Sequence, residues 1–327
     1  MEPLELVRLN LLSPPVLAFA LGVVATLARS DLKFPDQLYS ALSMYLMLAI
    51  GLKGGAELSQ TPLAVIGAPL AATLALGVIT PLTAYGVLRR LGRFDVFNSA
   101  ALAAHYGSVS VVTFTAALAF LQAANVSAEG FLPALVAVME VPAILIALVL
   151  AQAGRRNATN GEKTDWGRAL HEMLAGRSIV LLAGGLAIGF LSGKPGLERV
   201  APFFVAPFQG AVALFLLEMG MVAARRLRDV RQAGAFLVGF ALLAPLVHGA
   251  LGAWLGTLAG LSLGGSFVLG VLAASASYIA APAAVRVAIP EASPGYYLTA
   301  SLALTFPFNL TVGLPAVYAV ARLLHGQ

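Results

Sequence analysis

Long stretches of uncharged, apolar residues recur along the whole chain, and they constrain its fold more than any other feature. Runs of about 18 or more such residues indicate helices that cross a membrane. Only 11% of the 327 residues are charged and 59% are hydrophobic, against about 25% charged and 45–50% apolar in a soluble domain. A soluble core cannot bury so much apolar surface. The sequence therefore predicts an all-α polytopic membrane protein.

Charged or Pro/Gly-rich breaks divide the chain into ten predicted transmembrane helices. They cover residues 10–28, 36–52, 63–88, 97–123, 131–153, 177–193, 203–223, 233–259, 265–289 and 295–323. The first is taken as a transmembrane helix rather than a cleaved signal peptide, because Glu2 and Glu5 are unlike a positive leader. The longest polar interval, 154–176, separates five predicted helices from five.

The two halves resemble each other in three places that occur in the same order. The pairs are LMLAIGLKGGAEL (46–58) with LFLLEMGMVAARRL (214–227), LAAHYGSVSV (102–111) with LAASASYIAA (272–281), and VMEVPAILI (138–146) with LTFPFNLTV (304–312). With an odd number of spans in each half, the second copy must be inverted in the membrane, as in many secondary transporters. We predict a first repeat over 1–153, a linker over 154–176 and a second repeat over 177–327.

Lys and Arg are distributed unevenly between the two sets of connections. The connections after the odd-numbered spans carry 15 of them, and the even-numbered connections with both termini carry 5. By the positive-inside rule, the loop 154–176 is cytoplasmic and both termini lie outside, in the cell (inner) membrane. Basic residues placed in short loops indicate topology control and contact with the lipid bilayer, so the pI of about 9.7 does not predict a nucleic-acid partner.

The chain lacks several groups on which other functions depend. It has no cysteine, which excludes disulfides, thiol catalysis and zinc–thiolate sites. It has no Gly-rich loop ending in Lys-Ser/Thr, which argues against direct use of ATP. An intramembrane enzyme would need a pair such as Ser110 and His105, but these point about 140° apart on a helix. We expect no enzyme activity, no cofactor and no transition metal.

The fourth span of each half is interrupted by helix-breaking residues. Gly107-Ser108-Val109-Ser110 and Thr113 interrupt the first, and Ser275-Ala276-Ser277-Tyr278 precedes Pro282 in the second. Broken helices survive in a membrane only against protein or a wet cavity. Two breaks at matching places indicate a midplane site, where helix N-termini attract an anion and hydroxyl and carbonyl oxygens can ligate sodium. The alternative for each serine alone is close helix packing.

These and other segments resemble the sodium-dependent bicarbonate permease family, the SbtA type. The segments are GLKGG (51–55), YGSVSVVTFTAAL (106–118), MEVPA (139–143), APLVHG (244–249) and AASASYIAAPAAVRVAIP (273–290). The resemblance implies ten helices in two inverted five-helix repeats, with core and gate domains, assembled as a homotrimer. It also implies elevator-type, sodium-coupled symport of bicarbonate, and a PII-like regulator that binds on the cytoplasmic side.

By position, the resemblance also assigns the site. Gly107, Ser108 and Ser110 on one break, with Ser275, Ser277 and the neighbouring Tyr278 on the other, would bind bicarbonate. Ser110, Thr113 and Ser277 would bind sodium. The sequence departs from the family where the best-known members read S-S-S-D, because Tyr278 replaces the aspartate. A phenol is uncharged at neutral pH, which leaves sodium or proton coupling, and bicarbonate or another small anion such as a carboxylate, as alternatives.

Four further polar residues in the spans are candidates for coupling or for lining the pathway. Glu140 lies in mid-span, where an ionisable group is by default a functional hypothesis. Its alternative is a protonated side chain that hydrogen-bonds a neighbouring helix. His105 is a possible proton carrier or a packed interface residue. Thr305 and Asn309 lie in the segment that matches the one around Glu140.

Overall fold

The fold is helical throughout the part of the chain that a computed structural model describes, which is residues 8, 11–157, 167, 171 and 174–326. The α-helices are α2 (Pro14–Leu27), α3 (Asp36–Leu58), α4 (Leu63–Arg90), α5 (Val96–Gly107), α6 (Val111–Ala123), α7 (Leu132–Asn157), α9 (Arg177–Phe204), α10 (Phe208–Arg226), α11 (Val230–Leu258), α12 (Leu263–Ala274), α13 (Ala280–Ala288), α14 (Pro294–Leu298), α15 (Phe306–Phe308) and α16 (Leu314–Leu324). A 3-10 turn, η1 (Leu227–Asp229), and two π-helical stretches, η2 (Thr299–Thr305) and η3 (Asn309–Gly313), complete them. Most of the predicted linker 154–176 lies outside the described residues.

Among the described residues, eight helices are long and apolar enough to cross a membrane. Two shorter apolar helices, Pro14–Leu27 and Leu263–Ala274, lie at the first and ninth predicted spans. Large apolar side chains on the outside of the bundle fit this environment. On α4, Leu74, Val78 and Leu82 are 43%, 43% and 46% exposed and share one face at a spacing of four residues. The protein is therefore a multi-pass membrane protein.

One predicted span ends too early. The second was predicted to stop at residue 52, but α3 continues to Leu58, so Lys53 and Glu57 are helical. The sixth was predicted to stop at residue 193, and the helix is broken there: Gly193 has φ 60° and ψ −166°, and a second helical segment of α9 then runs to Phe204. Glycine adopts this conformation without steric cost. Lys53 ended the prediction for the second span, although a helix can continue through a charged residue where it emerges from the apolar layer.

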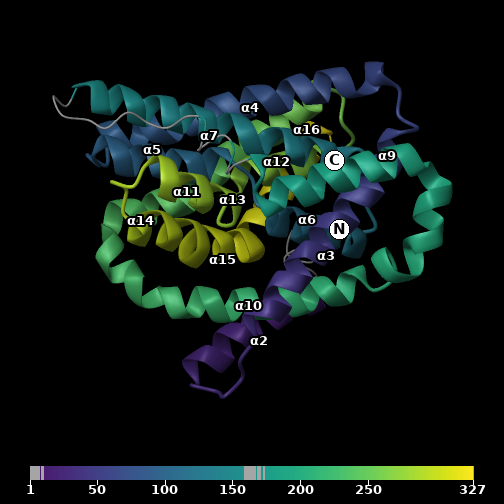
Figure 1. The fold of residues 1–327 in the computed structure, drawn as a ribbon, viewed down its shortest axis with the longest axis horizontal. Coiled ribbons are helices and arrows are strands. Elements are labelled where there is room, and N and C mark those ends of the chain that lie inside the picture. The colour runs from purple at the N-terminus through teal and green to yellow at the C-terminus, as the bar shows by residue number, and fades with distance from the viewer. Residues whose placement is uncertain (1–7, 9–10, 158–166, 168–170, 172–173, 327) are drawn as a thin grey trace.

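The helices divide into two groups by their contacts. In one group, α3 packs along α9 and α2 packs along α10. In the other, α4, α5 and α7 pack together, α6 packs on α12, and α11 packs on α12, η2 and α16. Figure 1 shows α9 and α10 running around the outside of the bundle, with α2 and α3 crossing them. Glycines allow both crossings, because a Cβ on Gly55 would collide with the backbone of Leu186 and one on Gly22 with that of Leu217.

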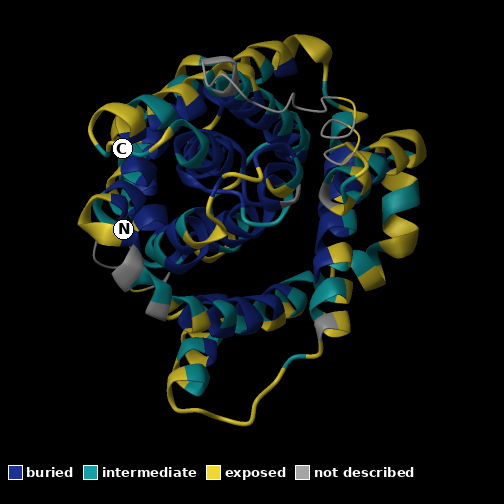
Figure 2. Ribbon diagram, turned by 60° about the vertical axis from the view of Figure 1, so that its left-hand side comes forward, coloured by how far each residue is buried: buried dark blue, intermediate teal, exposed yellow. Residues whose placement is uncertain are grey.

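Burial places the interrupted helix pair α5–α6 at the centre of the molecule. The most apolar window of Val96–Ala123 is 89% buried, against 17% for Ile179–Phe204 in α9. Figure 2 shows the buried ribbon gathered inside the bundle and the exposed ribbon on the peripheral helices. A polar interruption at the centre of the bundle is shielded from lipid by the surrounding helices, as unpaired backbone groups require.

Candidate functional site

The first interruption has the form that the sequence predicts. Helix α5 ends at Gly107, Ser108–Ser110 are extended or irregular, and α6 begins at Val111. Ser110 caps α6, since its hydroxyl oxygen accepts a hydrogen bond from the Thr113 backbone N–H at 3.1 Å. Thr113 itself lies buried in the first turn of α6 rather than in the interruption. Its predicted side-chain role in binding sodium stays a prediction.

The second interruption lies just before Pro282 and not at it. Helix α12 ends at Ala274 and α13 begins at Ala280. Pro282 therefore lies in the first turn of α13, where a missing N–H has no intrahelical partner to lose. The Ser277 hydroxyl oxygen accepts a hydrogen bond from the Ala281 N–H at 3.2 Å, as Ser110 does for α6.

The two interruptions cross each other and are joined by hydrogen bonds. The Ser110 N–H donates to the Ser275 hydroxyl oxygen at 3.0 Å, and the Ser277 N–H donates to the His105 carbonyl at 2.8 Å. The Ser275 hydroxyl in turn donates to the Leu272 carbonyl at 2.8 Å. All four predicted serines, including Ser108, are at most 4% exposed. The structure thus brings together residues that lie more than 160 positions apart.

A small cavity lies where the interruptions cross. Its volume is about 10 Å³, close to the least that holds one water molecule. The residues that line it are Met47, Val109, Ser110, Val111, Glu140, Ser277, Tyr278, Ile279 and Ala280. The first residues of α6 and of α13, Val111 and Ala280, both face it, so two helix N-termini converge there. Free N–H groups and the positive ends of two helix dipoles favour a negative charge in this place.

One side of this cavity is not evident from the sequence. Met47, on α3, is a lining residue, and it is the only described contribution to the cavity from outside the α4–α7 and α11–α16 group. An apolar residue in an apolar helix carries no signal of such a role. The sequence predicts that helix N-termini meet at the two interruptions. It does not identify which backbone N–H groups face the cavity, because these do not depend on side-chain type.

Glu140 also lines this cavity. Glu140 lies on α7, is 1% exposed, and its Oε2 has no hydrogen-bond partner among the described residues. The Ser108 hydroxyl donates to the Glu140 backbone carbonyl at 3.4 Å, which holds this part of α7 against the first interruption. A buried carboxylate without a partner is costly, so the arrangement provides a place for a proton or a cation.

The Tyr278 side chain lies beside the same group. Its hydroxyl is close to the Ser110 side chain but makes no hydrogen bond of ordinary geometry to a described residue. Its ring packs against Phe306, with the ring centroids 5.3 Å apart. Tyr278 lines the cavity where the sequence departs from the S-S-S-D pattern, and the acidic residue among the lining residues is Glu140, on α7.

The other three candidate residues make structural contacts outside the cavity lining. His105 Nδ1 is 2.7 Å from the Ala101 carbonyl oxygen, and the ring stacks on Tyr297. Its Nε2 has no partner among the described residues. Thr305 donates to the Ala241 carbonyl at 2.7 Å.

Asn309 serves the second interruption directly. Its Nδ2 donates to the Ala274 carbonyl at 2.8 Å and so satisfies the last residue of α12, while its Oδ1 has no partner in the described part of the chain. Gly107 is required by close packing, because a Cβ there would lie 2.7 Å from side-chain carbons of Pro81 and of Ala143. Both residues shape the interruptions.

The model of the family described as "Na+-dependent bicarbonate transporter superfamily" matches residues 14–322, nearly the whole chain. No curated protein matches the chain.

Proposed function

The chain belongs to the Na+-dependent bicarbonate transporter superfamily, and from this premise we propose that it takes up bicarbonate by sodium-coupled symport through a site between the two interrupted helices. The single observation that supports this most is the cavity at which the N-termini of α6 and α13 converge. Two helix N-termini and the serine hydroxyls are suited to an oxyanion. A hydroxyl that accepts a bond from its helix still has a proton to donate.

Binding is proposed to require a conformational change. A cavity of about 10 Å³ has room for one water-sized particle, and bicarbonate has four heavy atoms. The site residues Ser108, Ser110, Ser275 and Ser277, with Gly107 and Tyr278 beside them, would surround the anion once the interruptions separate slightly. The hydrogen bonds between Ser110 and Ser275 and between Ser277 and His105 would then give way to bonds with the substrate.

Coupling to a cation is proposed to depend on Glu140. An ionised Glu140 would repel an anion at the same helix N-termini, whereas a bound sodium ion would neutralise it and make room for bicarbonate. Sodium prefers oxygen ligands, and the carboxylate, the Ser110 and Ser277 hydroxyls and carbonyls of the interruptions offer them. Glu140 would thus take the part of the carboxylate that Tyr278 lacks, with Thr113, His105, Thr305 and Asn309 in supporting positions.

The two contact groups support an elevator-like movement of a core past a gate. We propose α2, α3, α9 and α10 as the gate domain and α4–α7 with α11–α16 as the core domain. The first and second helices of 1–153 are α2 and α3, and those of 177–327 are α9 and α10. In each direction the second helix of one repeat packs on the first helix of the other, α3 on α9 and α10 on α2, which supports two inverted repeats joined by 154–176. A homotrimer and a PII-like regulator on the cytoplasmic face belong to the same proposal.

Uptake into proteoliposomes tests the proposal. Radiolabelled bicarbonate should accumulate under an inward sodium gradient and not under a matched potassium gradient, and small carboxylates should not compete. Accumulation driven by a proton gradient alone would refute sodium coupling. Accumulation of a carboxylate in place of bicarbonate would refute the substrate, and hydrolytic activity without uptake would refute transport.

A further inference from the structure

A large cavity lies apart from the two interruptions. It has a volume of about 600 Å³, far larger than a bicarbonate ion needs. Its walls come from both contact groups, namely α3, the ends of α9 and α10, α6, the loop 124–131 and the start of α7. The connections at this end of the molecule follow the second, fourth and sixth predicted spans. The charge bias therefore places the pocket on the predicted external face.

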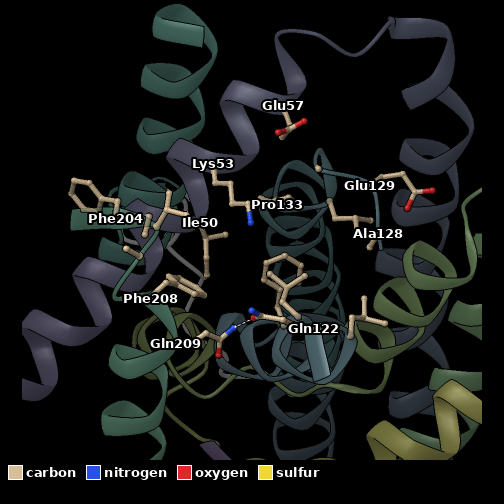
Figure 3. A pocket seen from close by; sticks show the side chains of 18 of the residues that line it. Ile50, Lys53, Glu57, Gln122, Ala128, Glu129, Pro133, Phe204, Phe208 and Gln209 are labelled. Carbon is tan, nitrogen blue, oxygen red and sulfur yellow. Dashed lines mark hydrogen bonds between the residues drawn. The ribbon is translucent and has the colours of Figure 1, made fainter. Parts of the chain in front are cut away.

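Lys53 projects into this pocket from α3. Figure 3 shows its ammonium group pointing into the space between Ile50 and Pro133. No ion pair or hydrogen bond joins this side chain to another residue of the described chain. An unpaired ammonium group within a membrane protein is stable only where water reaches it. The pocket is therefore a wet space with a positive charge inside it.

The two acidic residues of the lining are placed differently. Glu129 is engaged by the N-terminus of α12, since its carboxylate accepts hydrogen bonds from the Ser262 N–H at 2.6 Å and from the Ser262 hydroxyl at 3.1 Å. That helix end offsets its charge. Glu57 lies one turn beyond Lys53 on α3, and its side chain covers Gly130. Lys53 thus lies deeper in the pocket than Glu57, toward the small cavity.

The pocket and the small cavity are neighbours along two helices. Ile50 on α3 and Phe114 on α6 line the pocket, and the residues one turn earlier on each helix, Met47 and Val111, line the small cavity. Ile50 and Phe114 are 3% and 0% exposed. From Lys53 to Met47 is about 9 Å along the helix axis at 1.5 Å per residue. A single apolar layer therefore separates the two spaces.

We propose that this pocket is the entrance vestibule for the transported anion, that Lys53 attracts the anion into it, and that Ile50 and Phe114 close its floor. This inference rests on the proposed function for the nature of the anion. It assigns to Lys53 a role in capture that is distinct from binding at the interruptions. Lys53 attracts the anion electrostatically over a distance, so capture depends on the positive charge of the side chain and not on its exact shape.

The rate at which charged reagents modify a cysteine in the pocket measures the electrostatic potential there and does not require transport. The chain has no cysteine, so Leu118→Cys places a single thiol in the pocket wall, one turn from Phe114. The probes are an anionic and a cationic methanethiosulfonate of similar size. A potential of one kT, at the low end for a charged cleft, changes the ratio of their reaction rates about sevenfold. We expect Lys53→Gln to lower the anionic-to-cationic ratio by about that factor, and Lys53→Arg to preserve it.

Lys194→Gln is the matched control. Lys194 is an exposed lysine on α9 near the same face and does not line the pocket, so its loss should leave the ratio unchanged. An unchanged ratio in Lys53→Gln, or a thiol that neither reagent reaches, would overturn the vestibule. A lowered ratio in a protein that transports no bicarbonate would leave the vestibule standing and refute only the proposed function.

Discussion

Replacement of Glu140 by glutamine separates a coupling residue from a packing residue, because the two roles predict opposite effects on stability. Glutamine keeps the size and shape of the side chain and removes the charge. Glu140 is 1% exposed with an unpartnered Oε2 at the cavity between the interruptions. If the carboxylate is kept there to hold a cation, the neutral variant should fold at least as stably as the parent and need more sodium for the same uptake.

The magnitude follows from the environment of the carboxylate. An interaction with a charged partner contributes about 1.5–3 kcal/mol, and each 1.4 kcal/mol is tenfold in affinity. Glu140→Gln should therefore raise the sodium concentration for half-maximal uptake about ten- to a hundredfold. The desolvation of a buried ion costs several kcal/mol, so in sodium-free buffer the thermal unfolding temperature of the variant should be equal to or above that of the parent.

The assay is sodium-dependent bicarbonate uptake in proteoliposomes, with thermal unfolding measured on the same preparations with and without sodium. Glu198→Gln is the control, since it makes the same chemical change at an exposed position on α9. It should alter neither measurement. A variant at Glu140 that unfolds at a lower temperature but keeps its sodium dependence would show that the carboxyl group serves packing, and the coupling argument would be wrong.

Three further substitutions test the geometry of the interruptions. Ser275→Ala removes the acceptor of the Ser110 N–H and should lower the free energy of unfolding by about 1–3 kcal/mol, the cost of a buried donor left unpaired; an unchanged thermal transition would contradict the crossing. Gly107→Ala puts a Cβ 2.7 Å from carbons of two neighbouring helices and should lower the free energy of unfolding by about 1–3 kcal/mol. Gly67→Ala is the control, because no atom lies within 4 Å of the added Cβ, and it should leave the free energy of unfolding unchanged in the same assay. Tyr278→Asp adds a carboxylate beside Ser110 and should lower the sodium concentration for half-maximal uptake; abolished anion binding would instead identify Tyr278 as a substrate ligand.

The sequence by itself determined the class of the protein and the places where its helices are interrupted. Long apolar stretches require helices in a membrane, and Gly107, Ser108, Ser275 and Ser277 are weaker helix formers than the Ala and Leu residues around them. Both interruptions are present at these residues in the structure. The family resemblance was confirmed by a match over residues 14–322. The apolar stretches and the interruptions depend on the hydrophobicity and helix propensity of neighbouring residues, which can be read directly from the sequence.

Only the tertiary structure decided what the polar residues face. From the sequence, Glu140 is one of several polar candidates in the spans, whereas in the structure α7 places it at the cavity where the interruptions cross. Thr305 instead donates a hydrogen bond to the Ala241 carbonyl and does not line that cavity. The sequence places Lys53 in a loop, whereas in the structure it lies on α3 and lines a pocket together with residues of α6 and α10. Each of these outcomes depends on which residues from distant segments come together around one space. The packing of helices against one another sets that arrangement, and the order of residues along any one helix does not contain it.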